Sequence, residues 1–222
     1  MTDAATAAGL EPNPVADSFL ACLARARHIA SPYDYWLLEG ALPGEDAVAI
    51  AALPFAPPAG AAFSGRRETN NATRVYFNRE NQEKFPVCRR VVAGFNDPRV
   101  RRAIEQATGA DLSDGHLRIE YCQDAEGFWL EPHTGIFVKK FTMLIYLSDD
   151  PRLKNAGTDV HGGPPDYLYI CLAPYGKNLG LIFIPSPNTW HGVGKRPLNG
   201  AIRNSIIVNY VTSGWRDKYE LA

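Results

Sequence analysis

From Gly115 onward the sequence consists largely of short runs of β-branched and aromatic residues, separated by Gly, Pro, Asn and Asp. Runs of this length, bounded by turn-forming residues, are typical of β-strands. No helical pattern interrupts them, so strand follows strand, as in a β-sandwich or a jelly roll. The predicted strands are 116–122, 137–147, 167–173, 179–185 and 201–212.

The first half of the chain has a helical pattern. Asp17 or Ser18 is placed to cap a helix that runs through about residue 30 with one apolar face. A short strand is predicted over 35–38 and a second helix over 45–52.

A third helix is predicted over 97–108, with a start and a stop signal. Asp97 suits the N-cap, Pro98 the first helical position and Gly109 a left-handed exit. We expect these helices to pack against the outer face of one sheet of a single, mainly β domain.

The predicted domain spans residues 15–222, a length that one hydrophobic core can serve. Residues 1–14 are small and polar and are predicted to form a flexible tail. The stretch 56–71 is rich in Pro, Gly and Asn, which predicts a mobile or substrate-facing loop.

The composition of the chain argues against nucleic acids and membranes as binding partners. The chain is 45% hydrophobic and 21% charged with a net charge of -1, so it lacks the basic excess typical of nucleic-acid binding. It has no apolar run of membrane-spanning length and no signal-peptide pattern, which predicts a cytoplasmic protein with a small-molecule substrate and no membrane partner. The oligomeric state is left open. Cys22, Cys88, Cys122 and Cys171 are widely spaced, which predicts reduced thiols.

Two of the five histidines stand in positions that suggest chemistry. His133 lies in the segment Leu-Glu-Pro-His-Thr-Gly, just before a predicted strand. His191 lies in Asn-Thr-Trp-His-Gly between two strands, and Arg203 follows it on the last strand. Ser205 is two residues further on, so on a strand its hydroxyl shares a face with Arg203.

This order of residues resembles the Fe(II)/2-oxoglutarate oxygenase superfamily, and the segment from about residue 33 resembles its prolyl-hydroxylase-like members. The resemblance covers about 33–210 and implies a double-stranded β-helix, the cupin-like form of the jelly roll, flanked by N-terminal helices. It implies that His133 and His191 bind Fe(II) and that Arg203 binds 2-oxoglutarate, with Ser205 and Tyr121 as further co-substrate contacts. A guanidinium suits that role because it holds a carboxylate with two hydrogen bonds.

The sequence departs from the family pattern at one ligand. Members usually carry His-x-Asp or His-x-Glu at the first histidine, whereas here Gly135 leaves the third ligand position to water or a halide. In this respect the sequence resembles the halogenase branch, in which chloride or bromide fills the vacated site. Asp159 is not expected to replace the missing carboxylate, because it lies on a different segment from His133.

Three functions therefore remain open: hydroxylation of a small molecule with decarboxylation of 2-oxoglutarate to succinate, halogenation with chloride, or non-catalytic binding of 2-oxoglutarate or metal. Arg118 is a candidate for the cavity wall beside Tyr121. Arg74, Tyr76 and Asn78 alternate along one segment, which fits either substrate contacts that face the pocket or a solvent-facing edge, and the edge is the preferred interpretation.

Overall fold

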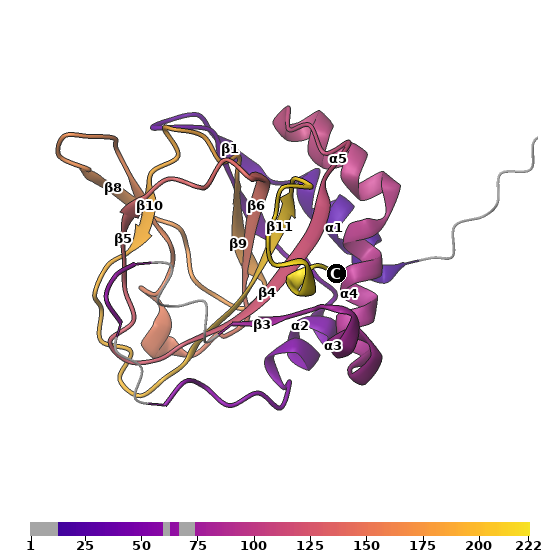
Figure 1. Cartoon of the computed structure of the whole chain (residues 1–222). Helices are drawn as coiled ribbons and strands as arrows, with labels where there is room; N and C mark the ends of the chain where they lie inside the picture. The colour runs from indigo at the N-terminus through magenta and orange to yellow at the C-terminus, as the bar shows by residue number, and fades with distance from the viewer. Residues whose placement is uncertain (1–12, 60–62, 67–73) are drawn as a thin grey trace, which may run out of the picture.

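The computed structural model describes residues 13–59, 63–66 and 74–222. Two antiparallel sheets face each other, and helices cover the outer face of the larger sheet (Figure 1). Within the described residues the larger sheet has seven strands: β1 (Arg27–Ile29), β2 (Tyr35–Glu39), β9 (Leu179–Phe183), β6 (Lys139–Tyr146), β11 (Arg203–Val211), β4 (His116–Asp124) and β3 (Val75–Tyr76), in that order.

The smaller sheet has four strands in the described part of the chain, in the order β5 (Leu130–His133), β10 (His191–Val193), β7 (Asp159–His161) and β8 (Tyr169–Leu172). From β4 onward the chain passes back and forth between the two sheets: β4, β6, β9 and β11 belong to the larger, and β5, β7, β8 and β10 to the smaller. This winding is a double-stranded β-helix, so the predicted mainly β fold is confirmed.

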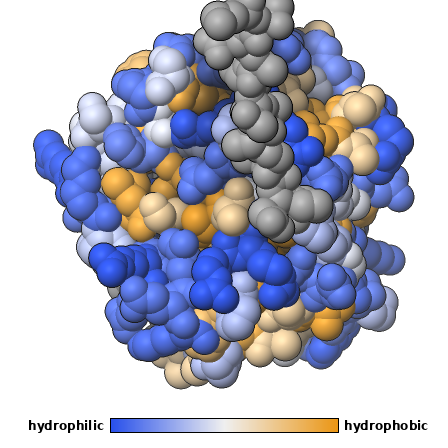
Figure 2. All heavy atoms as spheres, turned by 90° about the vertical axis from the view of Figure 1, so that its right-hand side faces the viewer, coloured by the Kyte–Doolittle hydropathy of each residue, from blue (hydrophilic) through white to orange (hydrophobic). Residues whose placement is uncertain are grey.

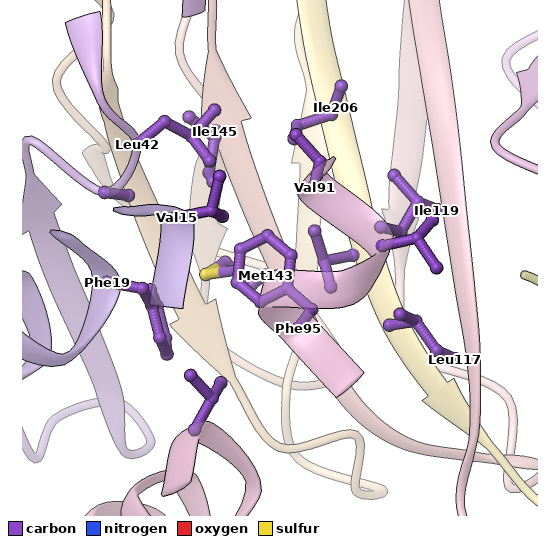
Figure 3. Packing of buried hydrophobic residues seen from close by; sticks show 14 of the residues in the cluster. Val15, Phe19, Leu42, Val91, Phe95, Leu117, Ile119, Met143, Ile145 and Ile206 are labelled. Carbon is purple, nitrogen blue, oxygen red and sulfur yellow. The ribbon is translucent and has the colours of Figure 1, made fainter. Parts of the chain in front are cut away.

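The main core lies between the larger sheet and the helices. Alternate residues of β11 point to opposite faces, and Ile206, Val208 and Tyr210 face the helices. Figure 3 shows this layer, where Phe95 packs beside Val91 over the strands. The hydroxyl of Tyr210 donates to the backbone carbonyl of Phe95, which ties the sheet to α4.

Five α-helices occur in the described residues: α1 (Pro14–Leu23), α2 (Gly44–Ala51), α3 (Arg79–Lys84), α4 (Pro86–Asn96) and α5 (Pro98–Thr108). The side of the molecule that carries them is mainly hydrophilic, with smaller apolar areas between (Figure 2). Helix α5 has the predicted signals: the Asp97 side chain accepts a hydrogen bond from the Arg99 N–H at 2.8 Å, and Gly109 has a φ of 73°.

Helix α1 differs from the prediction at both ends. It starts at Pro14, because Asn13 accepts hydrogen bonds from the N–H groups of Val15 and Ala16, whereas Asp17 or Ser18 was the expected cap. It ends at Leu23, and residues 27–29 form β1, which pairs with β2. Residues 1–12, most of the predicted tail, lie outside the described residues, as do 60–62 and 67–71 of the predicted loop.

Helices α3 and α4 and the short strands β3, β5, β7 and β10 fall outside the predicted elements. The strands have two to four residues and contain polar side chains, so they lack a local signal and depend on long-range pairing. All four cysteines are free thiols. None of the helices in the described part combines the length and the apolar character needed to cross a membrane.

A substitution at Phe95 tests how much the packing between the helices and the larger sheet stabilises the protein. Its side chain is fully buried, so Phe95→Ala should lower the free energy of unfolding by about 3–5 kcal/mol, through lost burial and the cavity that remains. Chemical denaturation measures the loss. The matched control is Phe137→Ala, because Phe137 is 84% exposed, and its effect should stay within about 0.5 kcal/mol. Equal effects of the two variants would contradict this packing.

Candidate metal and co-substrate site

His133 and His191 lie opposite each other where β5 pairs with β10. Their ring centroids are 4.4 Å apart. The Nδ1 atom of His133 is 2.8 Å from the carbonyl oxygen of Glu131, and that of His191 is 2.8 Å from the carbonyl oxygen of Thr189. A carbonyl can only accept, so each Nδ1 donates a proton, and in the neutral ring Nε2 bears the lone pair. Both imidazoles are thus held in the tautomer that binds a metal through Nε2.

The two histidines line a cavity between the sheets. Leu144, Phe183 and Ile207 form much of its apolar wall, and Phe183 also contacts the His191 ring, with 4.3 Å between centroids. Such a wall limits the access of water to anything held beside the histidines.

Arg203 lines the same cavity from the first position of β11. Its Nη1 donates to Asp124 Oδ2 at 2.6 Å and its Nε donates to the carbonyl oxygen of Ala156. Its Nη2 is buried and has no hydrogen-bond partner among the described residues. Burial alone would lower the pKa of Arg203, but the Asp124 carboxylate and the hydroxyls of Tyr146 and Tyr175 together outweigh burial and raise the pKa above its ordinary value. The guanidinium is therefore charged and keeps a donor for a ligand.

Ser205 lies on the same face of β11, between Arg203 and Ile207, as the alternation of a strand predicts. It is fully buried, and within the described part of the chain its Oγ has no hydrogen-bond partner. Ser205 is not among the residues that line the cavity, but it shares one face of β11 with Arg203, and two buried donors without partners in the described part of the chain fit the distal carboxylate of a keto acid.

The structure does not bring Tyr121 to the cavity. On β4 the side chains of Glu120 and Asp124 face the cavity, so Tyr121 has the opposite orientation and packs in the helix-side core. Its ring lies 6.2 Å from that of Phe55. The prediction that Tyr121 contacts the co-substrate is therefore wrong. Tyr121 is a core residue, because alternation along the strand turns its side chain away from the cavity.

Arg118 points to the same side of β4 as Glu120 but does not line the cavity. Its guanidinium forms ion pairs with Glu120 and with Glu220 from the C-terminal segment, and it stacks on the rings of Tyr76 and Trp215. Through these contacts Arg118 serves the packing of the C-terminal segment against the sheet.

Arg74 was interpreted as part of a solvent-facing edge, and this is wrong. Its side chain is 8% exposed, lines the cavity and donates to Asp124 Oδ1 at 3.2 Å. Tyr76 is also buried, and Asn78 caps α3. Asp124 was missed as a site residue, and for Arg74 the alternative of a pocket contact was considered but not preferred. The alternation of this segment is visible in the sequence, but only the pairing of β3 with β4 shows that its alternate residues face inward.

Gly135, which stands two residues after His133 where the family pattern has a carboxylate, also lines the cavity. A Cβ atom added here would lie 2.6 Å from Cβ of Pro185, a distance that real Cβ contacts do not show. Pro185 belongs to a rigid ring, so a side chain at 135 requires the backbone to shift. Glycine is thus the residue that this packing accepts.

Asp159 does not supply the missing carboxylate. Its Oδ1 pairs with Arg196 and its Oδ2 accepts a hydrogen bond from the Gly194 N–H at 2.6 Å. Among the described residues no cluster of three or more His, Cys, Asp or Glu side chains is placed to hold a metal ion. Within the described part of the chain, His133 and His191 are therefore the candidate protein ligands for a metal.

Solved structures of several proteins are similar to this one. A prolyl 4-hydroxylase from Pseudomonas putida aligns with a TM-score of 0.55 and 15% identity, over 93% of this chain and 99% of its own. A non-haem α-ketoglutarate-dependent epimerase from nogalamycin biosynthesis gives 0.52 and 17%, over 89% of this chain and 83% of its own. The chain has the fold of the 2-oxoglutarate–Fe(II) oxygenases.

A prolyl hydroxylase from Trichoplax adhaerens, solved with a hypoxia-inducible-factor peptide, shares this oxygenase fold, with a TM-score of 0.51 and 13% identity over 89% of each chain. No protein-family model matches the sequence, and the search of curated proteins found no similar sequence. The oxygenase fold sets the architecture, and the chemistry is inferred from the residues of the cavity.

Removal of one imidazole tests the metal site. His191→Ala should weaken Fe(II) binding by more than about 100-fold, beyond the loss that follows mutation of residues that only orient a ligand. Anaerobic calorimetric titration of the metal-free protein measures this. The control is His161→Ala, because His161 on β7 contacts Tyr167 and Tyr169 instead of the cavity. Stoichiometric, tight iron in His191→Ala would remove His191 from the site.

Proposed function

We propose that this protein is a non-haem Fe(II)/2-oxoglutarate-dependent oxygenase. It would oxidise a C–H bond of a small molecule while 2-oxoglutarate is decarboxylated to succinate. The observation that carries the proposal is the cavity that joins two tautomer-fixed imidazoles, His133 and His191, to the charged and incompletely bonded guanidinium of Arg203. Hydroxylases of proline and an α-ketoglutarate-dependent epimerase share the fold, which supports this class of reaction.

The residues would divide the work between the two ends of the co-substrate. Nε2 of His133 and of His191 would hold the iron, and Arg203 with Ser205 would hold the distal carboxylate of 2-oxoglutarate. Bound iron would supply the site at which the keto acid and oxygen react. The apolar wall around Phe183 would keep water from competing with the substrate.

Halogenation is the second candidate, and Gly135 favours it. With two neutral imidazoles and no carboxylate ligand among the described residues, a bound Fe(II) would keep one more positive charge than in a site with the usual aspartate. Chloride would compensate this charge at the position that Gly135 leaves. The contact of Gly135 with Pro185 supports a site adapted to glycine, because a decayed hydroxylase site would still have room for the lost side chain.

Visible spectroscopy of the anaerobic protein with Fe(II) and 2-oxoglutarate tests the proposal. A metal-to-ligand charge-transfer band is expected, because the keto acid chelates the iron. Arg203→Gln should raise the 2-oxoglutarate concentration at half-saturation of the band by at least about tenfold, the equivalent of 1.4 kcal/mol, with iron affinity unchanged. Absence of the band in the natural protein would favour a non-catalytic jelly roll.

Chloride and sulfate titrations at equal ionic strength separate the two reactions. A shift of the band with chloride alone is expected for a halogenase, whereas a band that responds to neither salt favours hydroxylation with water at the third position. Product analysis by mass spectrometry then identifies the transferred atom once a substrate is found.

Gly135→Asp tests whether the glycine is adapted or decayed. The clash with Pro185 predicts that this variant is less stable than the natural protein by about 1–3 kcal/mol, as for overpacked sites, and that its band no longer responds to chloride. Thermal denaturation and the chloride titration measure both effects. A stable Gly135→Asp variant that gains 2-oxoglutarate turnover would instead identify a decayed hydroxylase.

A further inference from the structure

Arg74 and Arg203 share a single carboxylate. Oδ1 of Asp124 accepts a hydrogen bond from Nη1 of Arg74 at 3.2 Å, and Oδ2 accepts one from Nη1 of Arg203 at 2.6 Å. All three side chains are buried, with exposed fractions of 8%, 4% and 3% for Arg74, Arg203 and Asp124. Because the two hydrogen bonds end on the two oxygens of one carboxylate, both guanidinium groups lie at the same end of the cavity.

Among the described residues, this end of the cavity carries an excess of one positive charge. Two guanidinium groups face one carboxylate, whereas the neighbouring cations Arg118 and Lys139 pair with the carboxylates of Glu120 and Glu220. An uncompensated buried charge is costly, which favours sites where a ligand supplies the opposite charge. One further carboxylate would make the group neutral.

The arrangement also supplies the donors. Nη2 of Arg203 has no hydrogen-bond partner among the described residues. Arg74 donates a hydrogen bond to Asp124 through Nη1. Arg74 immediately precedes β3, and its guanidinium lies 5.9 Å from the centroid of the Phe128 ring. Its position next to β4 is fixed by the pairing of Val75 with Tyr121.

We propose that Arg74 and Arg203 together bind the distal carboxylate of the keto-acid co-substrate, and that Arg74 makes the site selective for dicarboxylic over monocarboxylic keto acids. This inference rests on the proposed function. Asp124 holds the two guanidinium groups in place, and the incoming carboxylate is the second anion between them. A purely structural ion pair of Arg74 with Asp124 would stabilise the edge strand but would not discriminate between keto acids.

The test compares two keto acids that differ only in the distal group: 2-oxoglutarate and 2-oxopentanoate. Their dissociation constants are measured with the anaerobic Fe(II) protein, from the charge-transfer band and by calorimetry. Arg74→Gln should weaken 2-oxoglutarate by about tenfold, the equivalent of 1.4 kcal/mol, and leave 2-oxopentanoate within about twofold. Arg74→Lys, which retains the charge without the fork, should show a smaller loss.

Two controls make the result specific. Arg79→Gln removes the same charge from an exposed helix position paired with Glu83, and should leave both keto acids unchanged. The double variant Arg74→Gln/Arg203→Gln should lose less affinity for 2-oxoglutarate than the product of the two single losses, because both residues act on one carboxylate. Circular dichroism and melting temperatures establish that each variant is folded.

The proposal is overturned if Arg74→Gln binds 2-oxoglutarate as the natural protein does, or weakens both keto acids equally. If the natural protein binds neither keto acid, the proposed function fails, and glutarate decides the carboxylate site separately. Calorimetry with metal-free protein should then show glutarate binding that Arg74→Gln weakens and Arg79→Gln does not. Equal glutarate binding by all three proteins would exclude a carboxylate site at Arg74.

Discussion

The alternation of side chains along the central strands is the constraint on which the structure depends. Strand β11 has β4 on one side and β6 on the other, and both of its faces are covered. Ile206, Val208 and Tyr210 hold the helices on one face, which leaves Arg203 and Ser205 for the opposite face. One strand therefore anchors the core and orients the polar groups of the cavity, and a shift of register by one residue would exchange the two sets.

Much of the fold was predictable because its long strands and α5 carry local signals. The runs that became β6 and β9 are apolar on both faces, since helices cover one and the smaller sheet the other, and the runs that became β4 and β11 carry one apolar face, which packs on the helices. Most of the smaller sheet was not predictable, because β5, β7 and β10 are too short to show a period. Helix α4 had an apolar stripe from Val87 to Phe95 and a proline at its first position, a signal that was overlooked.

The residues of the candidate site also fall into those that the sequence predicts and those that it does not. His133, His191 and Arg203 were selected from their order along the chain, and the structure brings them to one cavity. Arg74 and Asp124 could not be selected from order alone, because they meet only when β3 pairs with β4 and β4 pairs with β11. The packing of Gly135 against Pro185 also joins distant segments, so the sequence shows that the carboxylate is missing but not what occupies its place.

The hydrogen bonds that Asp124 accepts have an entropic consequence. A free arginine side chain has about 2 kcal/mol of conformational freedom, which a ligand must remove when it orders the guanidinium. Here Asp124 restrains Arg74, while Asp124 and Ala156 together restrain Arg203. The two arginine side chains thus lose this conformational entropy when the protein folds. An anion that enters the cavity encounters donors that are already fixed.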